Sequence, residues 1–276
     1  MNAAQTSIRD ALYEPPGSKT KKWINIFTVI SVLLLAALLS AAIRQFYVTG
    51  QLDARYWYFF AQPTTWIFIA EGLAGTVEAA VCAGVIAFAA AFLMMLGRIS
   101  KYKVLRGITR ALIEFTRGVP TLLFVYFFFL VAPQYGISLP ALWKIAVPVA
   151  ISASGVVAEV LRSGVNAVSK GQIEAAVSLG MRGSSVFFKV VFPQAFRYVL
   201  PSLIAELVIV VKDTAFAYVV NFPDLMQNAK VLISNYSAML SVYLVVAVIY
   251  ILINYLLNKV SVIVAARTDR TLAPTK

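Results

Sequence analysis

The stretch LAGTVEAAVCAGVIAFAAAFLMML, residues 73–96, is apolar throughout and is interrupted by a single charged residue, Glu78. A helix needs about 20 mostly apolar residues to cross the hydrocarbon core of a bilayer, so this stretch is predicted to span a membrane. The whole chain agrees, because 61% of its 276 residues are hydrophobic and only 13% are charged. Soluble domains average roughly 25% charged residues. These proportions exclude a soluble enzyme, a disordered chain and a nucleic-acid-binding domain.

Further apolar runs of similar length are predicted to span the membrane as well. They are Trp23–Ile43, Phe115–Val131, Ala141–Leu161, Tyr198–Val220 and Leu240–Ala265. We therefore expect an all-α polytopic membrane protein with about six transmembrane helices. The first would be residues 23–43, and the other five would form a core within residues 72–265.

Basic residues gather in alternate loops of this predicted arrangement. The chain has 24 Lys and Arg against 12 Asp and Glu, a formal net charge of +12. Residues 1–22, 98–110 and 162–197 are rich in Lys and Arg, whereas residues 133–140 contain none. Cytoplasmic loops of membrane proteins carry the excess of Lys and Arg. Both termini are therefore predicted to be cytoplasmic tails, of residues 1–22 and 266–276.

The composition also limits the chemistry of the chain. There is no His, and the one Cys, Cys82, lies inside an apolar run. Without His, neither a His-ligated zinc site nor a Ser-His-Asp triad can be built. The Gly-x-x-x-x-Gly-Lys-Ser/Thr loop that cradles nucleotide phosphates is missing too. We expect no catalytic residue, cofactor or metal ligand in this chain, and we expect that it is not an enzyme.

The predicted cytoplasmic loop at residues 162–197 is long for a connection between bundle helices. Its apolar residues recur at helical spacing on both sides of Gly180, and Pro193 follows the second stretch. Two short helices joined by a glycine turn are therefore predicted, with Pro193 ending the second helix. Their small Ala and Gly side chains would let another surface approach closely, which favours a docking element for a cytosolic partner.

At this loop the sequence resembles a known family. Glu174-Ala175-Ala176, then Gly180, then Val190-Val191-Phe192-Pro193 is similar to the EAA loop of binding-protein-dependent ABC importer permeases, which prefer Ile at 190 and Leu at 192. Other segments resemble the polar amino acid subfamily of these permeases. They are Gly75-Thr76, Arg117-Gly118-Val119-Pro120, Ala158-Glu159-Val160, Arg162-Ser163-Gly164, Gly171-Gln172, Pro193-Gln194-Ala195 and Lys212-Asp213-Thr214.

The resemblance covers about residues 72–265, and it is specific because the motifs occur together. Ala215-Phe216 departs from the Ser-Leu that usually follows the last motif. The additional first span and the tail segment Tyr13–Gly17 are most similar to a glutamate permease of the actinobacterial type.

This resemblance implies the ABC type I importer permease fold in a bacterial cell membrane, and import of a polar amino acid, with glutamate as the leading substrate. ATP and Mg would be bound by a separate ATPase dimer on the cytoplasmic side. The other implied partners are an extracytoplasmic amino acid binding protein and a second permease subunit, with a heterodimer favoured over a homodimer. The residues implied in coupling to the ATPase are Gly171, Gln172, Glu174, Ala175, Ala176, Gly180 and Pro193. The alternative is an ATP-independent carrier or channel.

Charged side chains inside predicted spans are costly, at about 2.5–3.5 kcal/mol each near the centre, and usually face the bundle interior or an aqueous cavity. Candidates for the substrate path are Glu78, Arg117, Glu159, Lys212 and Asp213. Structural ion pairing is the competing interpretation, and Glu159 is expected to pair with Arg162 three residues later. An acidic substrate would favour Lys212 or Arg117 as counter-ion, and a cationic one Glu78, Glu159 or Asp213. The fourth span is interrupted by Pro148, Ser152, Ser154 and Gly155. Gly and Ser there are expected to serve helix packing, and the alternative is a broken helix that presents backbone groups to the substrate.

Overall fold

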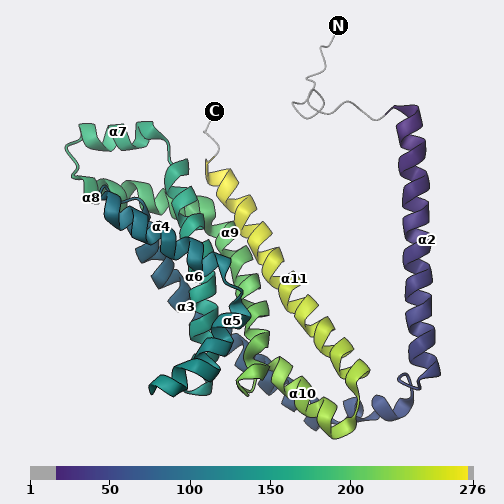
Figure 1. Ribbon diagram of the computed structural model, residues 1–276. Helices are drawn as coiled ribbons and strands as arrows, with labels where there is room; N and C mark the ends of the chain where they lie inside the picture. Colours follow the sequence, from purple (N-terminus) through teal and green to yellow (C-terminus); the bar gives the residue numbers. More distant parts are fainter. Residues whose placement is uncertain (1–16, 273–276) are drawn as a thin grey trace. The chain divides into compact units, whose positions relative to one another are not determined.

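The structure, a computed structural model, describes residues 17–272, with side chains described up to residue 266. The tail residues Tyr13–Pro16 and residues 273–276 lie outside the described part. Every regular element in that part is helical, which confirms the predicted all-α class (Figure 1). The chain forms two compact units, one ending at Tyr56 and one beginning at Trp57.

The first unit contains α2, Ser18–Val48, and the short 3-10 helix η1, Ala54–Tyr56. α2 has 31 residues, so at 1.5 Å per residue it is about 46 Å long. The predicted span Trp23–Ile43 lies within it. Its most apolar window has a mean hydropathy of 2.7, so α2 is long and apolar enough to cross a bilayer.

The second unit is a helical bundle. Its long helices are α3 (Pro63–Arg98), α4 (Lys103–Gly118), α6 (Ala141–Ala167), α9 (Phe192–Asp213), α10 (Leu225–Tyr236) and α11 (Met239–Leu272). Helix α6 packs between α3 and α9, and α11 packs on α9. Within the described residues, four helices are long and apolar enough to span a membrane, namely α2, α3, α6 and α11.

A fifth span results if α4 and the segment after it are counted together. The helix at the remaining predicted span, α9, is long but carries four charged residues: Arg197, Glu206, Lys212 and Asp213.

The predicted third span, Phe115–Val131, is wrong as a continuous helix. α4 ends at Gly118, and the chain turns by 95° before continuing through α5 (Thr121–Tyr126), a π-helical turn and a 3-10 turn to Tyr135. Val119 is extended, with φ −91° and ψ 125°. A residue before proline is driven out of the helical region by the proline ring, so Pro120 accounts for the break.

The predicted fifth span, Tyr198–Val220, is also displaced. α9 begins six residues earlier, at Phe192, and ends at Asp213, after which the chain tightens into the 3-10 helix η6, Thr214–Val219. The α-helix therefore ends at the adjacent charged residues Lys212 and Asp213. The hydropathy pattern does not indicate this end, because it predicts a span that continues to Val220.

Small side chains form the core between α3 and α6. On α3, a row of alanines at helical spacing is at most 1% exposed: Ala79, Ala83, Ala87 and Ala91. In lipid, helices gain little from the hydrophobic effect, so small residues that let backbones approach closely hold them together. Gly155 of α6 follows the same rule, since a Cβ there would lie 2.2 Å from the Thr116 hydroxyl of α4. Its expected packing role is confirmed.

Close packing also joins the first half of α3 to the start of α10. A Cβ on Gly75 would lie 2.1 Å from the carbonyl oxygen of Pro223. The neighbouring Thr76 hydroxyl accepts a hydrogen bond from the backbone N–H of Leu225 at 3.1 Å. The Asn228 side chain donates to the Phe68 carbonyl at 2.7 Å. The Gly75-Thr76 motif thus anchors the segment that precedes α10.

Asp224 caps α10 from a fully buried position. Its Oδ1 accepts the backbone N–H of Gln227 at 2.7 Å, while its Oδ2 has no hydrogen-bond partner among the described residues. Burial disfavours the charged carboxylate and raises the pKa of Asp224 to about 6 from its ordinary value of 3.8, although the backbone hydrogen bonds oppose this shift.

We expect Gly75→Ala to destabilise the protein by about 1–3 kcal/mol, because a methyl group there collides with backbone that cannot rotate away. Gly84→Ala is the matched control on the same helix, since its added Cβ meets only Leu207 at 3.6 Å, an ordinary contact. Thermal unfolding in detergent measures both. Equal melting temperatures for the two variants would contradict the close approach.

Asp224 should make stability fall as pH rises from about 4 to about 6. In that range the folded state binds the proton that the unfolded state has already lost, so raising the pH removes stability. The shift corresponds to on the order of 3 kcal/mol. Asp224→Asn keeps the capping acceptor without the charge, and its melting temperature should be higher than that of wild type at pH 7 and less dependent on pH. A pH slope unchanged in the variant would rule out this origin.

Candidate functional site

Beyond the last turn of α6, the chain forms a protrusion at one end of the bundle (Figure 1). It consists of α7 (Lys170–Ser178) and α8 (Gly183–Val186), followed by the π-helical turn η5 (Phe187–Val191). The first short helix and the glycine turn are as predicted, whereas the second helical stretch continues into α9. The segment leads directly into α9, a long helix of the bundle.

Gly180 ends α7 in a left-handed conformation, with φ +77°. The Gly180 N–H donates to the Val177 carbonyl at 2.8 Å, and the Met181 N–H donates to the Ala176 carbonyl at 3.2 Å. These two bonds form a Schellman motif, which favours glycine because other residues are strained at positive φ. A Cβ on Gly180 would meet no atom within 4 Å. The requirement for glycine inside this chain is therefore conformational rather than steric.

α7 packs on the rest of the protrusion through Ala176 and the partly buried Ile173. Ala176 is 5% exposed and packs with Val168, Val186, Val191 and Ala195. The remaining residues of the EAA-like motif are exposed: Gly171, Gln172, Glu174 and Ala175. Glu174 forms no side-chain hydrogen bond or ion pair with any described residue. The outer side of α7 is thus available to another molecule.

Two exposed apolar residues extend this outer side, Val177 at 57% and Leu179 at 83% exposure. The two glutamines of the flanking motifs meet, because Gln194 Nε2 donates to Gln172 Oε1 at 3.5 Å.

The prediction that Pro193 ends a helix is wrong. Helical structure runs from Gly183 through η5 into α9, and Pro193 lies in the first turn of α9, exposed. Proline is tolerated in a first helical turn, where its missing N–H would have no partner in the helix.

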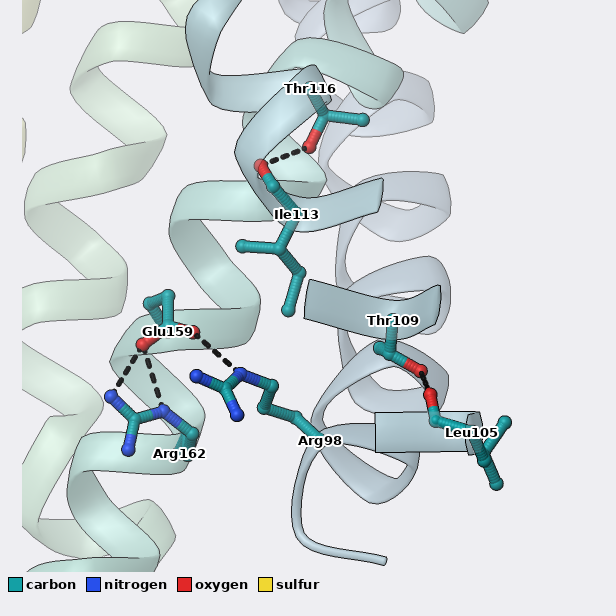
Figure 2. Close-up of polar contacts among 7 residues, drawn as sticks. All are labelled: Arg98, Leu105, Thr109, Ile113, Thr116, Glu159 and Arg162. Carbon is teal, nitrogen blue, oxygen red and sulfur yellow. Dashed lines mark hydrogen bonds and ion pairs between the residues drawn. The ribbon is translucent and has the colours of Figure 1, made fainter. Parts of the chain in front are cut away.

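Glu159 is an ion-pair centre on α6 (Figure 2). It contacts Arg162 at 2.6 and 2.8 Å, which confirms the expected i,i+3 pair, and Arg98 at the end of α3 at 3.7 Å. The three side chains are one quarter to one third exposed. Glu159 therefore ties the end of α3 to α6, and this contact supports the structural interpretation of its charge.

Asp213 lies in a polar cluster within the bundle. The Thr121 hydroxyl, at the start of α5, donates to Asp213 Oδ2 at 2.8 Å. It also lies 2.8 Å from the Ser152 hydroxyl of α6. Three separate segments thus bring polar groups together where α9 ends and where the chain bends after Pro120. Thr121 is a residue that sequence reasoning missed, because its partner Asp213 is 92 residues away.

The other charged candidates do not join this cluster. Glu78, Arg117 and Lys212 are exposed, and none forms an ion pair within the described part of the chain. Lys212, at the end of α9, borders a mostly apolar hollow of about 430 Å³ whose other lining residues come from η6, α10 and α11. Among the described residues, no group of three or more His, Cys, Asp or Glu is placed to hold a metal ion.

Comparisons with known proteins agree on one family. Residues 80–270 match the family described as "Binding-protein-dependent transport system inner membrane component". The glutamate transport system permease protein GluD of Corynebacterium glutamicum is 34% identical over 227 residues, 81% of this chain and 82% of that protein. The probable glutamine ABC transporter permease protein GlnP of Bacillus subtilis is 30% identical over 69% of this chain and 89% of its own length.

Solved structures give the same result. The bundle resembles a chain in a crystal structure of an amino acid ABC transporter with histidines, with a TM-score of 0.70 and 29% identity over 76% of this chain and 98% of that one. An inward-facing MetNI methionine ABC transporter matches with a TM-score of 0.59 over 74% of this chain and 99% of that one. At 19% identity, that second likeness supports the fold alone.

Glu159→Gln should destabilise the protein by about 1–2 kcal/mol, because it leaves two partly buried guanidinium groups without their anion. Glu78→Gln is the matched control, since Glu78 is exposed and unpaired among the described residues, and a change within about 0.5 kcal/mol is expected there. Thermal unfolding in detergent at low salt would detect the difference. Equal effects of the two variants would mean that the Glu159 ion pairs contribute nothing.

Proposed function

Because the chain belongs to the family of binding-protein-dependent transport system inner membrane components, we propose that it is the permease subunit of an ATP-driven importer of polar amino acids. The chain is a multi-pass membrane protein of the bacterial cell membrane and a transport protein. The relatives named for glutamate and glutamine support an amino acid substrate, and the glutamate permease GluD makes glutamate the leading candidate.

The protrusion at α7 is the observation that carries the coupling part of this proposal. It presents Glu174, Ala175 and Leu179 outward, while Ala176 and the partly buried Ile173 pack α7 against the rest of the protrusion. An ATPase that closes around α7 would move α9 through η5, so that nucleotide state would bias the bundle between two arrangements. In this proposal the coupling residues are Gly171, Gln172, Glu174, Ala175, Ala176, Gly180 and Pro193.

The remaining parts belong to other chains. ATP and Mg are bound by an ATPase dimer that docks on the protrusion from the cytoplasm. An extracytoplasmic amino acid binding protein delivers the substrate, and a second permease subunit, in a heterodimer, completes the path. The chain described here carries no chemical step of its own.

The substrate path in this proposal passes the polar cluster at Asp213. Its three polar groups come from α5, α6 and α9, and Lys212 beside it is exposed. Arg117 precedes Thr121 by four residues and is therefore a candidate for the same path. Glu78 remains a candidate on α3, whereas Glu159 is the weakest candidate because two arginines already neutralise it.

We expect Gly180→Trp to abolish amino acid uptake by the reconstituted complex, and with it the substrate-stimulated ATP hydrolysis, while the binding protein still captures substrate. A bulky residue there blocks the docking surface and strains the turn. Gly136→Trp is the matched control, because Gly136 also has positive φ (+79°) and open space around it, but precedes α6 at the opposite end of that helix.

Retained uptake in Gly136→Trp with loss in Gly180→Trp separates docking from backbone strain. Normal uptake in Gly180→Trp would contradict the coupling role of the protrusion. Uptake by the permease in liposomes without any ATPase would favour the alternative, an ATP-independent carrier or channel.

A further inference from the structure

Helix α4 has three different faces. Its exposed apolar side chains lie within about 100° of one another around the helix; they are Val104, Leu105, Ile108, Leu112 and Phe115. Its buried side chains, Thr109, Ile113 and Thr116, pack on the bundle. Four cations, all exposed, fall within about 60° on the side opposite the apolar face; they are Lys103, Arg106, Arg110 and Arg117. Glu114 is the single acidic residue among them.

The contacts of the buried face fix how deep α4 enters the bundle. Thr109 abuts Gly97, next to the last residue of α3, where an added Cβ would lie 2.5 Å from the Thr109 hydroxyl. Seven residues later, Thr116 abuts Gly155, near the middle of α6. Figure 2 shows Thr109, Ile113 and Thr116 in succession beside α6, with Glu159 and Arg98 towards the end from which α4 starts. α4 therefore runs from one end of the bundle towards its centre.

The row of cations consequently extends from the end of the bundle to the level of the middle of α6. Arg117 lies one residue after Thr116, level with the middle of α6. Charged side chains at this depth need water or a counter-charge. None of the four cations forms an ion pair with a described residue. The opposite, apolar face of α4 is the one suited to lipid or to a second subunit, which leaves the basic face for an aqueous space.

The row also ends at the polar cluster. Thr121, which binds Asp213 and lies beside Ser152, follows Arg117 by four residues. The cations therefore connect the proposed substrate path with the end of the bundle where α3 ends and α4 begins, within the basic segment 98–110 that is predicted to be cytoplasmic.

We propose that the basic face of α4 lines a water-filled exit vestibule that conducts an anionic amino acid, with a side-chain carboxylate, from the Asp213 cluster to the cytoplasm. This rests on the proposed import function and names its substrate class. Four cations against one anion in a cavity with low-dielectric walls attract anions and raise their local concentration. Anionic lipid headgroups are a poorer fit, because Arg117 lies level with the middle of α6 rather than at the membrane surface.

Thiol labelling tests the vestibule directly. In a Cys82→Ala background, Gly107→Cys places a thiol beside Lys103 and Arg110, where an added Cβ meets no atom within 4 Å. Ile108→Cys is the matched control on the apolar face. Inside-out membrane vesicles containing the whole complex are treated with impermeant thiosulfonates that carry either a sulfonate or a trimethylammonium group, and each rate is divided by the rate on free cysteine.

We expect Gly107→Cys to react at least about tenfold faster than Ile108→Cys, and to prefer the anionic reagent by about tenfold. Adding Arg106→Gln and Arg110→Gln should remove most of that preference. Equal labelling of the two positions, or no preference for the anionic reagent, would overturn the vestibule. The preference for the anionic reagent could also depend on the lipid, appearing only in membranes rich in anionic lipid or disappearing there. Either result would assign the basic face to lipid headgroups and overturn the vestibule as well.

Uptake by the reconstituted complex tests the substrate class separately. Arg106→Gln with Arg110→Gln should lower glutamate uptake about fivefold at low ionic strength, and added salt should shrink the difference because it screens the field. Lys230→Gln, an exposed lysine on α10, is the control and should leave uptake unchanged. Import of neutral or cationic amino acids only by wild type would overturn the anionic assignment. A wild-type complex that imports no amino acid at all would instead contradict the proposed function.

Discussion

The close approach of helix backbones is the constraint on which this bundle depends. Lipid is as apolar as the helix surfaces, so packing must come from contact between backbones and small side chains rather than from exclusion of water. The alanine row of α3 meets α6 in this way. Glycines also allow the remaining elements to pack closely. α4 packs at Gly97 and Gly155, the segment before α10 packs at Gly75, and α9 packs at Gly164. At Gly75, Gly155 and Gly164 an added Cβ would lie 3.0 Å or less from a backbone carbonyl oxygen, so a single methyl group there forces the neighbouring backbone to shift.

Polar groups inside the bundle occur where two or more segments can share them. Glu159 holds two arginines from α3 and α6, and Asp213 accepts the hydroxyl of Thr121 from across the bend. The two carboxylates differ, because Glu159 is paired with two arginines, whereas among the described residues Asp213 accepts one hydrogen bond, from the neutral Thr121 hydroxyl, and forms no ion pair. A charge that its own chain leaves without an opposite charge, close to a break in helical structure, is better placed to interact with a substrate.

Apolar runs identified α2, α3, α6 and α11 correctly, because each is a continuous helix whose length alone matches a bilayer. The third and fifth spans failed where local backbone chemistry overrides hydropathy, at Pro120 and after Asp213. Gly180 was predictable from its position between two helical stretches, whereas Pro193 was misinterpreted because proline stops a helix only beyond its first turn. The Thr121–Asp213 and Thr76–Leu225 contacts join residues 92 and 149 positions apart, and no local pattern indicates them.

The motifs that resemble the permease family divide into two physical groups. Apart from the exposed Arg117 and Lys212, those inside the bundle have partners within the chain: Gly75-Thr76 binds the segment before α10, Glu159 binds Arg162, and Asp213 binds Thr121. Their residue types follow from packing and hydrogen bonding in a place that excludes water. Glu174 and Ala175 on α7 have no such explanation, because they are exposed and the fold needs neither of them. Exposed side chains that the fold does not need are free to contact another protein, which supports the proposal that the ATPase docks on α7.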